Sequence, residues 1–204
     1  TVDGAIHIQS QQDLQILAEN CRLDTWSQGK TVILDRDITL DEDAQDFLPI
    51  PTFGGTFEGG GHTISGFSLT GEDSNAGLFD TLQESAVVSR LTVVGQVTPS
   101  GAGDTIGGIA GTNYGKLVGC SFEGAVKGKD TVGGLVGVNE TTGQLISCRC
   151  QGMVTGEHYV GGIVGQNSGS VIQCRNDGDI NTTAVEVSAD LTDLSLLGTT
   201  ESVP

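Results

Sequence analysis

Ile106-Gly107-Gly108-Ile109-Ala110-Gly111-Thr112-Asn113 is the first of three closely similar phrases in this chain. The other two are Val132-Gly133-Gly134-Leu135-Val136-Gly137-Val138-Asn139 and Val160-Gly161-Gly162-Ile163-Val164-Gly165-Gln166-Asn167. A cysteine follows each phrase and a glycine follows each cysteine four residues later, in the pairs Cys120/Gly124, Cys148/Gly152 and Cys174/Gly178. Self-similarity at a fixed period of about 20–50 residues is typical of a solenoid.

The phrases begin 26 and then 28 residues apart. The two extra residues, Thr141 and Thr142, leave the flanking pattern intact, which predicts that they lie in a surface loop. Each repeat holds short β-type pieces separated by glycine and shows no apolar 3.6-residue period. The sequence therefore predicts an all-β fold, a right-handed parallel β-helix with three short strands per coil.

The pattern continues towards the N-terminus in a weaker form. Ala76-Gly77-Leu78-Phe79 matches the glycine phrase, and Leu91 with Gly95 takes the places of a cysteine and its glycine. We expect about six coils over residues 31–180, with clear repeats in 105–180. The repeat is lost in residues 181–204, which are predicted to form a C-terminal cap or a linker.

Residues 1–30 are predicted to cap the N-terminal end of the solenoid. Ser10 followed by Asp13 is a capping signature for a helix near residues 11–21. One face of this helix would be apolar, because small and aliphatic side chains recur at helical spacing at Leu14, Leu17, Ala18 and Cys21. A solenoid needs such a cap, since its terminal coil otherwise exposes the core.

Composition excludes several classes of partner. The net charge is −17 with nine Lys and Arg, which argues against nucleic acid as a partner. No apolar run approaches the length of a membrane span, so no membrane insertion is expected. The acidic run Asp41-Glu42-Asp43 leaves calcium as an alternative, but neither EF-hand spacing nor a calcium-binding nonapeptide repeat is present. No other cofactor is predicted.

Residues that share a repeat position are expected to stack on neighbouring coils. One set is interpreted as a ladder of small buried thiols, although a disulfide between adjacent coils stays open as an alternative; it consists of Cys120, Cys148 and Cys174. A second set lies at a corner, where asparagine bonds to neighbouring main chain; it consists of Asn113, Asn139 and Asn167. Both ladders are predicted to be structural.

No catalytic or metal-binding motif occurs in the chain, and its three histidines lie at unrelated repeat positions. The best candidate for a binding surface is an exposed strand face next to the cysteines. Arg149 and Arg175 share one outward position, and Glu123 and Asp177 share another. Charges of both signs on a sheet face are also the ordinary result of cross-strand pairing, so catalysis at this patch is not favoured.

The phrase Val-Gly-Gly-Leu-Val-Gly-x-Asn with its following cysteine resembles the GLUG repeat of bacterial surface proteins, which occurs in adhesin-like proteins and in non-catalytic regions of IgA-specific metallopeptidases. This resemblance implies a β-helix domain of a secreted or cell-surface bacterial protein, acting as an adhesin, a spacer or a substrate-docking module. Its partners would be host glycoproteins, polysaccharides or other domains of the same polypeptide. The alternative is a carbohydrate-active lyase or hydrolase on a similar β-helix.

Overall fold

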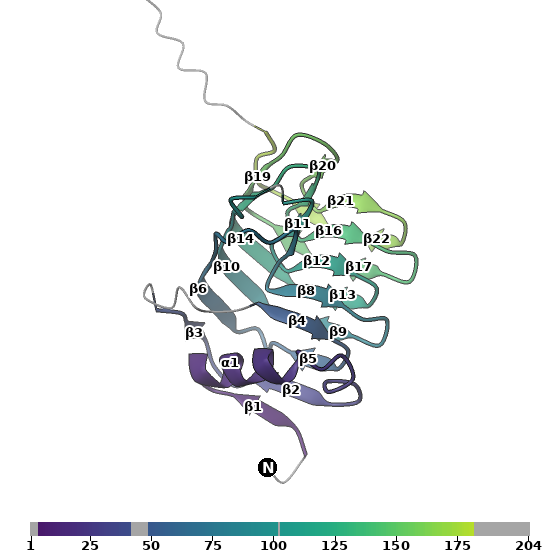
Figure 1. Cartoon of the computed structure of the whole chain (residues 1–204). Helices are drawn as coiled ribbons and strands as arrows, with labels where there is room; N and C mark the ends of the chain where they lie inside the picture. The colour runs from purple at the N-terminus through teal and green to yellow at the C-terminus, as the bar shows by residue number, and fades with distance from the viewer. Residues whose placement is uncertain (1–3, 42–48, 102, 182–204) are drawn as a thin grey trace, which may run out of the picture.

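The structure is a computed structural model that describes residues 4–41, 49–101 and 103–181. The chain forms a parallel β-solenoid of about six turns, as the repeats predicted (Figure 1). Every pair of adjacent strands in the described part is parallel, because each strand bonds to the equivalent strand of the next coil. The register follows the repeat, so that Ile106 pairs with Val132, and Val132 with Val160.

Four sheets run along the solenoid. Sheet A contains seven strands, which are β1 (Ile6–Ile8), β2 (Thr31–Leu34), β5 (Thr56–Glu58), β9 (Val87–Ser89), β13 (Lys116–Val118), β17 (Gln144–Ile146) and β22 (Ser170–Ile172). Sheet B contains β3 (Ile38–Thr39), β6 (Thr63–Leu69), β10 (Thr92–Val97), β14 (Ser121–Lys127), β18 (Arg149–Cys150) and β23 (Arg175–Asn176), with β19 (Met153–Thr155) pairing to β14.

The glycine phrase builds the other two sheets. Sheet C contains β4 (Ile50–Phe53), β8 (Phe79–Leu82), β12 (Ala110–Asn113), β16 (Val136–Asn139) and β21 (Val164–Asn167). Sheet D contains β7 (Asn75–Ala76), β11 (Thr105–Gly107), β15 (Thr131–Gly133) and β20 (Val160–Gly161). The prediction of three strands per coil was therefore wrong, because the phrase bends in its middle and contributes two strands to each coil.

Steric contacts explain why the phrase is rich in glycine. A side chain on Gly133 would collide with the carbonyl oxygen of Val136 at the bend. One on Gly134 would collide with the Cys150 sulfur inside the coil. One on Gly137 would lie 2.8 Å from the backbone nitrogen of Ile106, because sheet D passes over sheet C there. Each glycine is thus required by close packing between two parts of the solenoid.

The core is a narrow stack of apolar side chains that are almost fully buried. Near the N-terminal end it is aromatic, where the Phe53, Phe57 and Phe79 rings pack with centroids 5.5–6.1 Å apart. Further along it becomes aliphatic, with Leu117 and Leu145 in register and 0% exposed. Burial of this stack supplies the main stabilisation of a fold that has little other secondary structure.

Helix α1 (Gln11–Asn20) packs at the N-terminal end of the solenoid (Figure 1). The Ser10 hydroxyl accepts a hydrogen bond from the Asp13 amide at 3.2 Å, and the Asp13 carboxylate accepts one from the Gln9 amide at 2.9 Å. The first bond satisfies a backbone donor that the first turn leaves free, and the second ties the Asp13 side chain to the residue before the N-cap. The apolar face is buried as the sequence pattern indicated, through Leu14, Leu17, Ala18 and Cys21.

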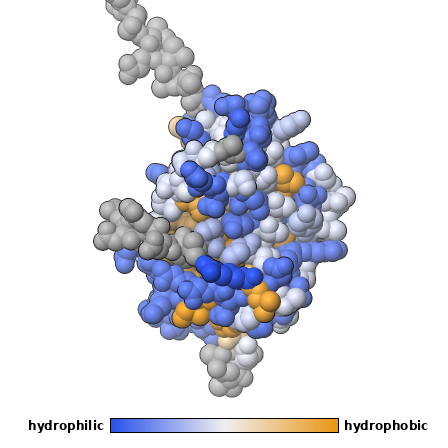
Figure 2. All heavy atoms as spheres, in the orientation of Figure 1, coloured by the Kyte–Doolittle hydropathy of each residue, from blue (hydrophilic) through white to orange (hydrophobic). Residues whose placement is uncertain are grey.

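The last described coil differs from those before it. Val171 is 38% exposed, whereas Leu145, its partner in the preceding coil, is 0% exposed. Ile180 is 41% exposed, whereas Val154, to which it is bridged, is fully buried. Strands β20, β21, β22 and β23 each end their sheet. Elsewhere the face shown in Figure 2 is mainly hydrophilic, with small separate apolar groups.

Candidate functional site

The four residues predicted as a binding surface lie together on the outer face of sheet B. Arg149 pairs in register with Arg175 on the adjacent strands β18 and β23. The Arg149 guanidinium donates to the Asp177 carboxylate at 2.6 Å, and Arg175 forms an ion pair with the other oxygen of Asp177. The Gln151 amide, oriented to satisfy both neighbours, donates to Glu123 at 3.0 Å and accepts from Arg149 at 2.9 Å.

This patch is a network in which the charges bind one another. The hydrogen bond from Arg149, with that from Arg175, holds the pKa of Asp177 below its usual value. Asp177 is therefore an ionised carboxylate whose position is held by the two arginines. Glu123 already accepts a hydrogen bond from the Gln151 amide. Glycoside hydrolysis needs one carboxyl that stays protonated and a second that activates water or attacks the sugar. Asp177, whose pKa is lowered, does not suit the role of the protonated carboxyl, and the Arg175 side chain is 74% exposed although it pairs with Asp177.

The three predicted corner asparagines form a hydrogen-bonded stack. The side-chain amide of Asn113 donates to Asn139 at 2.8 Å, and that of Asn139 donates to Asn167 at 2.8 Å. Asn113 and Asn139 are 0% exposed, and each also binds the backbone of its own corner. Buried amides of this kind need such partners, so the stack holds the corners of three coils in register.

The cysteines stack along the inside of the corner between sheets A and B, and all five thiols of the chain are free. Cys120 and Cys148 are buried, and Cys174 is partly exposed because no described coil follows it. The neighbouring Cys120 thiol and burial raise the pKa of Cys148, and burial raises that of Cys150. The hydrogen bond with Cys148 lowers the pKa of Cys120, and buried thiols of this size pack as small apolar side chains.

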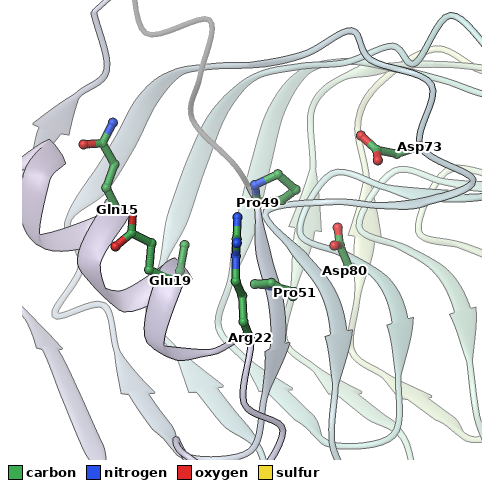
Figure 3. Close-up of a pocket in the computed structure, with 8 residues that line it drawn as sticks. Gln15, Glu19, Arg22, Pro49, Pro51, Asp73 and Asp80 are labelled. Carbon is green, nitrogen blue, oxygen red and sulfur yellow. The ribbon is translucent and has the colours of Figure 1, made fainter.

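A cavity of about 390 Å³ lies between α1 and sheet C (Figure 3). Glu19 and Arg22 approach it from the end of the helix, and Asp73 and Asp80 lie on the opposite side. One Asp80 carboxylate oxygen is buried without a hydrogen-bond partner in the described part of the chain. Burial, together with the charge of Asp73, raises the pKa of Asp80 to about 7. The sequence did not reveal this site, because its residues come from four distant segments.

A second hollow, of about 490 Å³, lies where strands of sheet C turn into strands of sheet A. Its lining residues come from four successive coils and present polar side chains and corner backbone, including Glu84, Lys116, Thr141, Thr142 and Gln144. The prediction that Thr141 and Thr142 lie in a surface loop is confirmed, since both are exposed in the turn between β16 and β17. We call this hollow the corner groove.

The structure describes only part of the acidic run considered for calcium. Asp41 is described, whereas Glu42 and Asp43 fall outside the described residues. Within residues 4–41, 49–101 and 103–181, no group of three or more His, Cys, Asp or Glu side chains is arranged to hold a metal ion. In the same ranges, no helix is long and apolar enough to cross a membrane.

Comparison with known proteins agrees with the stacked glycine phrases. The GLUG motif matches residues 156–181, which contain the third phrase and the last described coil. The second phrase pairs with the third in register and the first pairs with the second, so the coil that matches the GLUG motif stacks on coils of similar sequence.

One similar protein is halomucin of Haloquadratum walsbyi, which is 32% identical to this chain over 152 residues. That alignment covers 69% of this chain and 2% of halomucin, so the chain corresponds to a very small part of that protein. No solved structure matches the chain.

Proposed function

We propose that this chain is a non-enzymatic β-helix domain of a cell-surface or secreted protein and that it acts as a rigid spacer. The observation that carries the proposal is the set of side-chain links between coils. The asparagine stack joins three consecutive coils through two bonds of 2.8 Å. On other faces, Arg149 is tied to Asp177 and Arg90 to Glu58, each across one coil.

The histidines add to these links. His7, His62 and His158 each contact an aspartate of a neighbouring coil through Nδ1, at 2.8, 3.1 and 2.8 Å from Asp35, Asp37 and Asp130. Side chains that bridge each coil to the next oppose bending and shear, which a spacer must resist. Export is supported by the GLUG repeats, by the similarity to halomucin and by the strongly acidic composition, which favours solubility. Bacterial origin stays a prediction from the resemblance.

Two measurements test this proposal. Protease treatment of intact cells, followed by detection with an antibody raised against the domain, should remove the protein without lysis. Pulling on the domain by its ends in a force microscope should give a cooperative unfolding event at a force that falls in the Asn139→Ala variant. A protein that is protected in intact cells, or a domain that extends gradually at low force, would overturn the proposal.

A further inference from the structure

We propose that the corner groove binds a short neutral saccharide. The groove arises from an alternation in the length of the corners between sheets C and A. Two residues, Tyr114 and Gly115, join β12 to β13, whereas four residues join the strands of the coil before and the coil after. The four-residue corners are 83–86 and 140–143. The short corner is therefore recessed between two projecting ones.

The two projecting walls are built alike and are held rigidly. In each wall the fourth residue donates to the carbonyl of the first, from Ala86 to Gln83 at 2.9 Å and from Gly143 to Glu140 at 2.8 Å. A hydroxyl in each wall also donates to the short corner of the preceding coil. These bonds run from Ser85 to Gly54 and from Thr142 to Tyr114, both at 2.7 Å. A preorganised site loses little entropy when a ligand binds.

The dimensions suit a sugar. The walls are two coils apart, which corresponds to roughly 10 Å at the usual strand spacing. Gly115 at the base of the groove packs closely against the neighbouring corner, since a Cβ there would approach the Ala86 carbonyl oxygen to 2.5 Å and the Gln83 carbonyl oxygen to 2.6 Å. Val87, Lys116, Gln144 and Ser170 lie in register along sheet A and bound the groove on its inner side. A linear chain could lie across these coils.

Three of the polar side chains that line the groove are not engaged with the protein itself. Across the described part of the chain, the Lys116 amine, the Glu84 carboxylate and the Gln144 amide make no side-chain hydrogen bond or ion pair. This contrasts with the patch on sheet B, where Arg149 and Asp177 satisfy each other. Donors and acceptors both line the groove, which carries one positive and one negative side chain. That arrangement suits the adjacent hydroxyls of an uncharged sugar, each of which both donates and accepts.

Binding should be tested with the full chain and three neutral probes, maltohexaose, cellohexaose and mannohexaose, at millimolar concentration. We expect at least one to shift the backbone amide NMR signals of residues 84–87, 115–116 and 141–144. A hexagalacturonate probe and an extended neutral peptide serve as comparisons and should bind more weakly. The inference is overturned if no neutral hexasaccharide shifts these signals, if the shifts lie elsewhere, or if the peptide binds more tightly.

The repeat itself supplies a matched variant. Deleting Thr141 and Thr142 leaves Asn139-Glu140-Gly143, the same Asn-x-Gly corner as Asn113-Tyr114-Gly115 and Asn167-Ser168-Gly169. The fold should persist, since two neighbouring coils already use this corner, but one wall of the groove is lost. We expect affinity to fall at least tenfold.

Inserting two threonines between Tyr114 and Gly115 should fill the recess and have the same effect. Lys127→Ala, on the distant sheet B, should leave binding unchanged. Undiminished affinity in the deletion variant, with circular dichroism unchanged, would refute the site. The spacer proposal does not depend on this result, because its tests measure exposure on cells and mechanical strength.

Discussion

Asn139→Ala tests whether the asparagine stack holds the coils together. The side chain is 0% exposed, and its three shortest bonds are with Asn113 and Asn167 at 2.8 Å and with the Gly143 carbonyl at 3.2 Å. A buried hydrogen bond contributes about 1 kcal/mol, and a buried group left without a partner costs more. The loss of all three, with the small cavity, should therefore lower the free energy of unfolding by roughly 3–4 kcal/mol.

Asn167→Ala is the matched control. Asn167 occupies the same position in the last described coil, where it is exposed and has one described asparagine neighbour. Its removal should cost only about 1 kcal/mol. For a domain of this size, the two changes correspond to falls in Tm of about 10 °C and about 3 °C. Thermal and urea unfolding, followed by circular dichroism, would measure both.

The reasoning fails if the two variants lose equal stability. It also fails if Asn139→Ala costs less than about 1 kcal/mol, because the buried stack would then contribute no more than an exposed pair.

Three further predictions concern the interior. The pKa of Asp80 rises from 3.8 to about 7 on folding, so the free energy of unfolding of the wild type should fall as pH rises between these values. The Asp80→Asn variant should lose this pH dependence. At pH above 7 it should be more stable than the wild type by up to about 4 kcal/mol, as measured by urea unfolding. Iodoacetamide should label Cys174 before any other thiol, and mass spectrometry showing Cys148 labelled first would contradict the burial order. The Gly134→Ala variant should be less stable than the wild type by roughly 2–3 kcal/mol, because the added Cβ would collide with Gly162 and Cys150. An unchanged Tm would show that the coil shifts to make room for the methyl group.

The repeat made the solenoid predictable from sequence, because residues at one repeat position must stack on themselves. Matching Leu91 to Cys120 located the inward row, and the structure pairs the strands that follow them, Thr92 with Ser121. The number of sheets was not predictable in the same way. The bend inside the phrase depends on contacts such as that of Gly134 with Cys150, which join residues of different strands.

The candidate sites were less accessible to sequence reasoning. The outward positions of Arg149 and Asp177 follow from strand alternation, but their mutual pairing depends on side-chain conformation. Only one of the two projecting corners that form the corner groove was identified from the sequence. The Thr141-Thr142 insertion was evident, whereas its counterpart at Glu84-Ser85 was not identified, although Ala76-Gly77-Leu78-Phe79 in the same coil aligns with the glycine phrase. The cavity beside α1 had no signal, because the helix packs there through tertiary contacts alone.

The exposed apolar positions of the last described coil imply that resistance to opening is graded along the solenoid. In a linear array each coil is held by its neighbours, and a coil with one described neighbour opens at lower free energy than one with two. Val171 contacts water where Leu145 does not, so transient opening should begin in β22 and move inward. Amide protons of β12 would then exchange only when the whole domain unfolds. Among the described coils, the last should therefore open at the lowest free energy and the central ones at the highest, although all of them follow one sequence pattern.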